Sequence, residues 1–260
     1  MLKEIQEGYV KSETHKGITT IEFFHPQSNS LPGKILEELA QEIHFAGTHN
    51  ETNVIVLKSA GEKSFCAGAS FDELLQIKNE EEGLKFFSGF AYVINAMRKC
   101  PKFIIARVQG KCVGGGVGLA AAADYAIAVV NADIKLSELA IGIGPFVVGP
   151  AVERKVGNSA FSALAIDATN WRNSEWAKKK GLFTEVHENI ENMDEAVQRL
   201  SHNLAHSSLA AMAELKKVCW RGTEHWDVLL KERAMISGRL ILSDFSRNAI
   251  QKFKTDKASR

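Results

Sequence analysis

Cysteine and the familiar metal and nucleophile motifs are scarce in this chain of 260 residues. Its four cysteines show no CxxC spacing, which argues against a disulfide framework and suits a reducing cytoplasm. The eight histidines show no HExxH spacing, so the sequence predicts no metal site. The absence of a GxSxG elbow disfavours a serine hydrolase.

The chain also lacks an excess of charge of one sign and long apolar runs. The formal net charge is +1, which points to neither nucleic acid nor an acidic membrane surface as a partner. No apolar run reaches the roughly 18 residues of a transmembrane helix. The N-terminal stretch MLKEIQEGYV lacks the basic-then-apolar pattern of a signal peptide, so we expect a cytoplasmic protein.

Strand and helix patterns alternate up to about Asp194, which predicts an α/β fold. The pattern predicts a hairpin over 1–24 that turns around Gly17, helices over 33–46 and 80–97, and strands over 54–58, 103–108 and 125–129. Beyond this point only helical patterns follow, over 196–206, 209–221 and 226–242. We therefore expect a core of repeated strand–helix turns over 1–194 and a helical module over 195–260.

The most informative stretch is FIIARVQGKCVGGGVGLAAAAD, which predicts a buried strand, a glycine turn and a helix beginning near Gly115. Its first helical amides have no intrahelical partner, and the helix dipole favours negative charge there. The spacing does not fit a dinucleotide fingerprint, because Leu119 stands where the third glycine would be, and no P-loop Lys-Ser/Thr pair follows. The turn predicts an anion-stabilising pocket; tight helix–strand packing is the alternative.

A second turn of small residues occurs in SFCAGASFDEL, where Ala67, Gly68 and Ala69 precede a helix that Ser70 or Asp72 could cap. Each of the two turns can present a free backbone amide. Two such amides that converge on one point form an oxyanion hole.

Glu138 lies in the apolar segment KLSELAIGIG, beside Leu136, Leu139, Ile141 and Ile143. Desolvation there would raise the carboxyl pKa into the range useful for proton transfer. The alternative is an exposed or capping glutamate that follows Ser137.

In this order, the segments HPQSNSLPGKILEEL, SFCAGASFDEL, GKCVGGGVGLAAAADYAIA, LSELAIGIGPFVVGPAVERKVG and SEWAKKKGLFTEV resemble the crotonase family, also called the enoyl-CoA hydratase/isomerase family. The resemblance implies a spiral of repeated β-β-α turns, C-terminal helices that form a trimer or a hexamer, and an acyl-CoA thioester substrate whose enolate is held by two backbone amides. It implies no cofactor, because coenzyme A is part of the substrate. It assigns the oxyanion-hole amides to Ala69 and Gly115, and substrate binding to Ser30, Ala67, Gly68, Phe71, Gly114 and Gly118.

One departure from the family pattern bears on the chemistry. Hydratases of the family carry two catalytic glutamates, and here the first position is Gly118 while the second is Glu138. We expect a hydratase with Glu138 as general acid and base; the alternatives are an enoyl-CoA isomerase with Glu138 as sole base, and an acyl-CoA-binding protein with little turnover. The sequence leaves the acyl group open.

Two further sets of residues have two interpretations each. The aromatic side chains of the helix over 80–97 either line the acyl pocket or pack in the core (Phe86, Phe87, Phe90 and Tyr92). Lys252 and Lys254 either meet the CoA phosphates or form a solvated basic tail.

Overall fold

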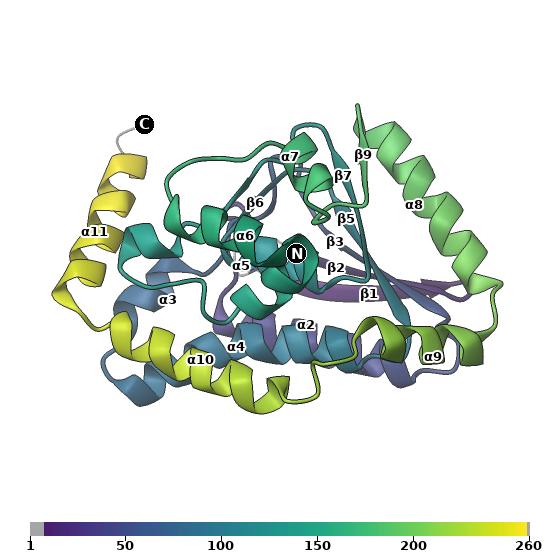
Figure 1. Ribbon diagram of the computed structural model, residues 1–260, viewed down its shortest axis with the longest axis horizontal. Helices are drawn as coiled ribbons and strands as arrows, with labels where there is room; N and C mark the ends of the chain where they lie inside the picture. Colours follow the sequence, from purple (N-terminus) through teal and green to yellow (C-terminus); the bar gives the residue numbers. More distant parts are fainter. Residues whose placement is uncertain (1–7, 259–260) are drawn as a thin grey trace.

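A six-stranded sheet forms the frame of the protein in the computed structural model, which describes residues 8–258, with side chains up to Thr255 (Figure 1). Strands β1 (Tyr9–His15) and β2 (Ile18–Phe24) form an antiparallel hairpin. Parallel strands then follow in the order β3 (Val54–Ser59), β5 (Phe103–Val108), β7 (Tyr125–Val129) and β9 (Glu185–His187). The hairpin and the three strands expected from the sequence are confirmed; the part of the hairpin prediction that falls on residues 1–7 lies outside the described residues.

A smaller sheet of three short parallel strands lies beside the first, formed by β4 (Ser64–Cys66), β6 (Lys111–Val113) and β8 (Ile134–Lys135). Each follows a strand of the large sheet and leads to a helix, respectively α3 (Phe71–Gln76), α5 (Gly115–Ala122) and the 3-10 helix η1 (Glu138–Ile141). This repeat is the expected α/β spiral of β-β-α turns. Because β4, β6 and β8 are neighbours, the three candidate segments of the sequence meet at one edge.

Helix α5 is buried along its whole length, which its small residues allow. Helices α2 (Gly33–Thr48) and α4 (Glu80–Lys99) pack together on one side of the spiral. Both were expected, with ends that differ by two residues. Two further helices, α6 (Gly149–Ile166) and α7 (Ser174–Lys179), lie between β8 and β9.

The C-terminal part contains four helices where the sequence analysis expected three: α8 (Ile190–Ala205), α9 (Leu209–Cys219), α10 (Trp226–Leu240) and α11 (Asp244–Ala258). Helix α8 begins six residues earlier than expected, because the Asn189 side chain caps it by accepting from the Asn192 amide. It packs on the large sheet, so the expected boundary after Asp194 falls within a helix of the core.

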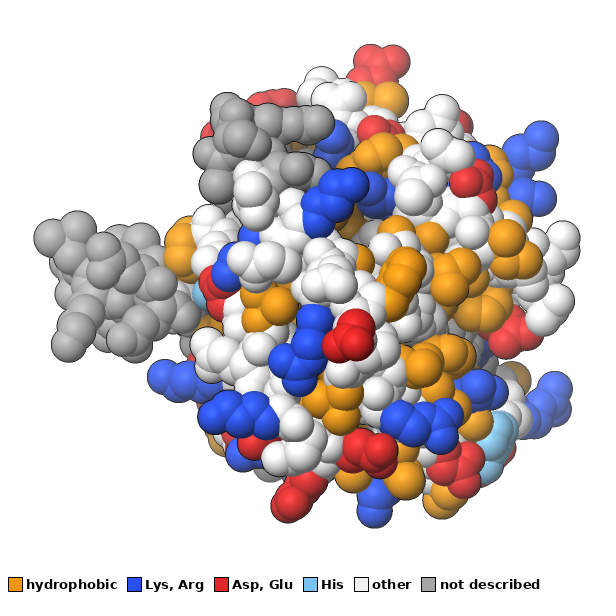
Figure 2. Space-filling model, turned by 90° about the vertical axis from the view of Figure 1, so that its left-hand side faces the viewer, with side chains coloured by type: hydrophobic (Ala, Val, Ile, Leu, Met, Phe, Trp, Pro, Cys, Tyr) orange, Lys and Arg blue, Asp and Glu red, His pale blue; other side chains and the backbone are white. Residues whose placement is uncertain are grey.

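Helix α11 corrects the interpretation of the C-terminal segment as a tail. Ser243 Oγ accepts from the Ser246 amide at 3.2 Å and caps the helix, which packs against α3 and η1. Lys254 forms an ion pair with Asp72 of α3, so it is not a free tail cation. Figure 2 shows this side of the molecule, where hydrophobic side chains share the surface with lysine and arginine. Within residues 8–258, no helix has the length and hydropathy to cross a membrane.

Candidate active site

A cavity of about 50 Å³ lies where the turns after β4 and β6 meet η1. Most residues predicted for the site line it, namely Ala67, Gly68, Ala69, Phe71, Gly114, Gly115 and Glu138. Two of the predicted residues, Ser30 and Gly118, are not among its lining residues. The topology therefore brings together the two small-residue turns and the carboxylate that the sequence placed about 70 residues apart.

The amide of Ala69 is left free by the way its turn is held. The Leu31 amide donates to the Gly68 carbonyl at 2.7 Å, and the Ser70 amide donates to the Leu31 carbonyl at 3.1 Å. In such a parallel bridge the groups of the middle residue, Ala69, point away from the neighbouring chain. Among residues 8–258 the Ala69 N–H has no hydrogen-bond acceptor.

The amide of Gly115 is free for a different reason, because α5 begins at this residue. Gly114 precedes it with φ +52° and ψ −115°, a conformation that favours glycine, and the Gly114 amide donates to the Lys135 carbonyl at 2.8 Å. The two turns touch, since a Cβ on Gly68 would lie 3.5 Å from the Gly115 nitrogen. Across the described residues no acceptor faces the Gly115 N–H, so the cavity has two adjacent free donors.

Among the residues that the structure describes, Glu138 is the only ionisable one that lines the cavity. Its Oε2 atom is buried and has no hydrogen-bond partner within residues 8–258, and burial raises the pKa of the carboxyl to about 7. Ile141 and Ile143 line the cavity beside it, as expected, but Leu139 is 50% exposed and does not contribute to the apolar surroundings. The interpretation of Glu138 as an exposed glutamate does not fit this burial.

Gly118 lies on the buried face of α5 against Val148, which precedes α6. A Cβ on Gly118 would stand 2.5 Å from Val148 Cγ1, so the valine occupies the space that a side chain at position 118 would need. Ser30 is buried in the segment that pairs with the Ala67–Ser70 turn, and its Oγ has no partner among the described residues. Ser30 therefore lies next to the turn but outside the cavity lining.

The sequence analysis missed most of the wall that closes the cavity, and named only Phe87 and Phe90 of it as possible lining residues. It is made by the segment between η1 and α6 together with α4 and α10, through Pro145, Phe146, Val147, Val148, Phe87, Phe90 and Ser237. Of the aromatic residues with two interpretations, Phe87 and Phe90 are lining residues, whereas Tyr92 is 61% exposed. No local pattern marks Val148 or Ser237, because only the packing of α6 and α10 brings them to the cavity.

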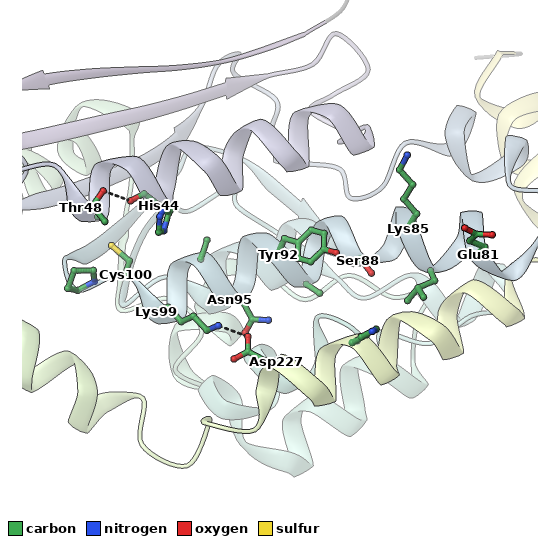
Figure 3. Close-up of a pocket in the computed structure, with 16 residues that line it drawn as sticks. His44, Thr48, Glu81, Lys85, Ser88, Tyr92, Asn95, Lys99, Cys100 and Asp227 are labelled. Carbon is green, nitrogen blue, oxygen red and sulfur yellow. Dashed lines mark hydrogen bonds and ion pairs between the residues drawn. The ribbon is translucent and has the colours of Figure 1, made fainter.

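A larger hollow of about 790 Å³ lies elsewhere, between α2, α4 and α10 (Figure 3). One ion pair crosses it, with Lys99 Nζ of α4 at 2.7 Å from Asp227 Oδ1 of α10. It lacks the combination of free amides and a buried, unpaired carboxylate, so the chemistry is assigned to the smaller cavity. Within the described part of the chain no three His, Cys, Asp or Glu side chains gather as a metal site would require.

Known proteins resemble this chain over most of its length. The enoyl-CoA hydratase/isomerase family model matches residues 13–255. The short-chain-enoyl-CoA hydratase of Clostridium acetobutylicum is 30% identical over 223 residues, which cover 85% of this chain and 84% of that protein. A probable enoyl-CoA hydratase of Rhodobacter capsulatus is 28% identical and covers 94% of each chain. The crystal structure of enoyl-CoA hydratase from Bacillus halodurans superposes with a TM-score of 0.86 at 21% identity, covering 94% of this chain and 99% of that one, which supports the same fold.

Proposed function

The chain belongs to the enoyl-CoA hydratase/isomerase family, and we propose that it moves the double bond of an enoyl-CoA thioester with Glu138 as its only acid–base group. One observation carries this proposal. Within residues 8–258, Glu138 is the sole ionisable residue lining the cavity, and it lies beside two backbone amides that have no acceptor. Double-bond migration needs one base that can return its proton, whereas hydration also needs a positioned water.

In the proposed reaction the thioester oxygen accepts hydrogen bonds from the amides of Ala69 and Gly115. The ionised Glu138 removes a proton from the carbon between the carbonyl and the double bond of a 3-enoyl-CoA. The electron pair of that C–H bond passes to the thioester oxygen, and the resulting dienolate is stabilised by the two donors. Glu138 then returns the proton to the far carbon, which leaves the conjugated 2-enoyl-CoA and restores the carboxylate. The reaction requires no cofactor beyond the CoA of the substrate.

The electrostatics of the cavity support this role. A base works best when its pKa is close to the working pH, and burial raises the pKa of Glu138 to about 7. The apolar wall keeps competing water away from the enolate. Val148 against Gly118 also leaves no room for a second carboxylate that would hold a water.

Hydration of a 2-enoyl-CoA is a second candidate, favoured by the relatives that are named enoyl-CoA hydratases. Here Glu138 would have to activate water and protonate the α-carbon by itself. The cavity of about 50 Å³ is large enough for a water molecule beside a small acyl group, because a buried water needs roughly 10–15 Å³.

Absorbance of the conjugated enoyl thioester separates the candidates. Mixed with a 3-enoyl-CoA, the protein should produce absorbance as the double bond moves into conjugation. Mixed with a 2-enoyl-CoA, it should cause a loss of absorbance only if it hydrates. Binding of both without any change would identify an acyl-CoA-binding protein with little turnover and would contradict the proposal. The control is Glu138→Gln, which keeps the size and removes the base.

A further inference from the structure

Val148 is part of the wall of the cavity that the free amides of Ala69 and Gly115 also line. The residue comes directly before α6, is 4% exposed, and lines the cavity with Val147 and Phe146. Its side chain lies against Gly118 of α5 so closely that a Cβ there would be 2.5 Å away. Because every residue of helix α5 is buried, there is no free space on the α5 side into which the Val148 side chain could move.

Other parts of the cavity wall are also closely packed. A Cβ on Gly115 would stand 2.2 Å from Phe90 Cε1, and a Cβ on Gly144 would stand 2.7 Å from the Phe146 ring. The remaining volume is about 50 Å³. Because a buried water needs roughly 10–15 Å³ of such volume, the cavity has room for only a few small groups.

We infer that Val148 is a specificity-determining residue that restricts the cavity to short acyl groups. This inference rests on the proposed function, since it places the acyl chain of the substrate in this cavity. The substrate class is a short-chain acyl-CoA whose chain ends at the Val148 side chain. A longer chain would have to displace Val148 from Gly118.

The test measures binding of saturated acyl-CoA thioesters by calorimetry, so it needs no turnover. Acetyl-, butyryl-, hexanoyl- and octanoyl-CoA are titrated into the wild type and into Val148→Ala. The wild type should bind butyryl-CoA best and hexanoyl-CoA at least about 10-fold more weakly, the scale of discrimination that one methylene produces in an apolar pocket. Val148→Ala should raise the hexanoyl-to-butyryl affinity ratio about 10-fold.

The matched control is Val152→Ala. Val152 lies in the first turn of α6, is fully buried, and does not line the cavity, so this variant loses the same two methyl groups four residues further along the chain. Its affinity ratio should equal that of the wild type. The inference is overturned if the wild type binds octanoyl-CoA as tightly as butyryl-CoA, if both variants shift the ratio equally, or if no acyl-CoA binds. If Val148→Ala shifts the chain-length preference but the wild type catalyses no proton transfer, the result contradicts the proposed function and supports this inference.

Discussion

The carboxylate of Glu138 lies against the backbone of Gly114, with Oε1 3.0 Å from the position that a Cβ on Gly114 would take. The base is therefore held one residue away from the free amide of Gly115, at the start of α5. This contact puts the Glu138 carboxylate of η1 beside the turn that presents the Gly115 amide, which is the arrangement that the proposed enolate chemistry requires.

The first prediction concerns the dependence of activity on pH. Only ionised Glu138 can remove a proton, and burial raises its pKa to about 7. The value of kcat/KM, which reports the ionisation of groups in the free enzyme, should therefore rise with pH and level off above about 7. Glu138→Gln should lower turnover ~100- to 10,000-fold while acyl-CoA binding persists. Full activity in this variant would contradict the mechanism.

The second prediction concerns stability. Because the pKa of Glu138 is about 7 in the folded state and 4.5 as its ordinary value, the folded protein holds a proton that the unfolded chain releases between these two pH values. The extra proton held by the folded state adds up to ~3 kcal/mol to the free energy of unfolding. This stabilisation is fully present below pH ~4.5 and is lost as the pH rises through ~7.

Denaturant unfolding at pH 5 and pH 8 tests this relation. Glu138→Gln has no proton to lose, so its free energy of unfolding should fall less than that of the wild type between the two pH values. Equal changes in both proteins would show that the buried carboxylate does not carry the shift.

A third prediction concerns the oxyanion hole. Gly115→Val should crowd Phe90, because even a Cβ would stand 2.2 Å from its ring. We expect turnover to fall on the order of 100-fold, since an oxyanion donor is typically worth ~3 kcal/mol. Thermal unfolding separates this loss from misfolding, and adding Phe90→Leu should relieve the overpacking. An unchanged rate and an unchanged melting temperature in Gly115→Val would exclude the assignment.

A fourth prediction concerns position 118, where this chain has glycine and the family's hydratases have their first catalytic glutamate. Gly118→Glu by itself should destabilise the protein by roughly 1–3 kcal/mol or more, the usual cost of overpacking, because Val148 occupies the space beside it. Gly118→Glu combined with Val148→Gly removes this clash and should raise hydration of a four-carbon 2-enoyl-CoA above that of Val148→Gly alone. The loss of enoyl absorbance gives the rate; no gain in the double variant would mean that the second carboxylate is not what limits hydration.

The fifth prediction concerns assembly. We expect a trimer or a dimer of trimers that uses the C-terminal helices, several of which carry exposed apolar side chains, including Val228 and Met235 of α10 and Phe245 of α11. Light scattering should give three or six times the chain mass of 28.6 kDa. A monomer at micromolar concentration would rule this out, and Val228→Glu should reduce the mass if α10 lies in the interface.

Several elements were determined by local sequence alone. The glycine run predicts bare amides and a helix that begins near Gly115, and α5 does begin at that residue. Ser70 or Asp72 was expected to cap α3, and it is the Ser70 Oγ that accepts from the Glu73 amide. These features depend on neighbours within four residues, which the sequence displays directly.

Other features were decided only by tertiary structure. The burial of Glu138, the exposure of Leu139 and the contact of Val148 with Gly118 depend on how η1, α5 and α6 pack, which no local pattern specifies. The sequence alone determined which groups are available for chemistry, namely two bare amides and one carboxylate. The tertiary structure decided their surroundings, because cavity volume and desolvation arise from contacts between segments distant in the chain.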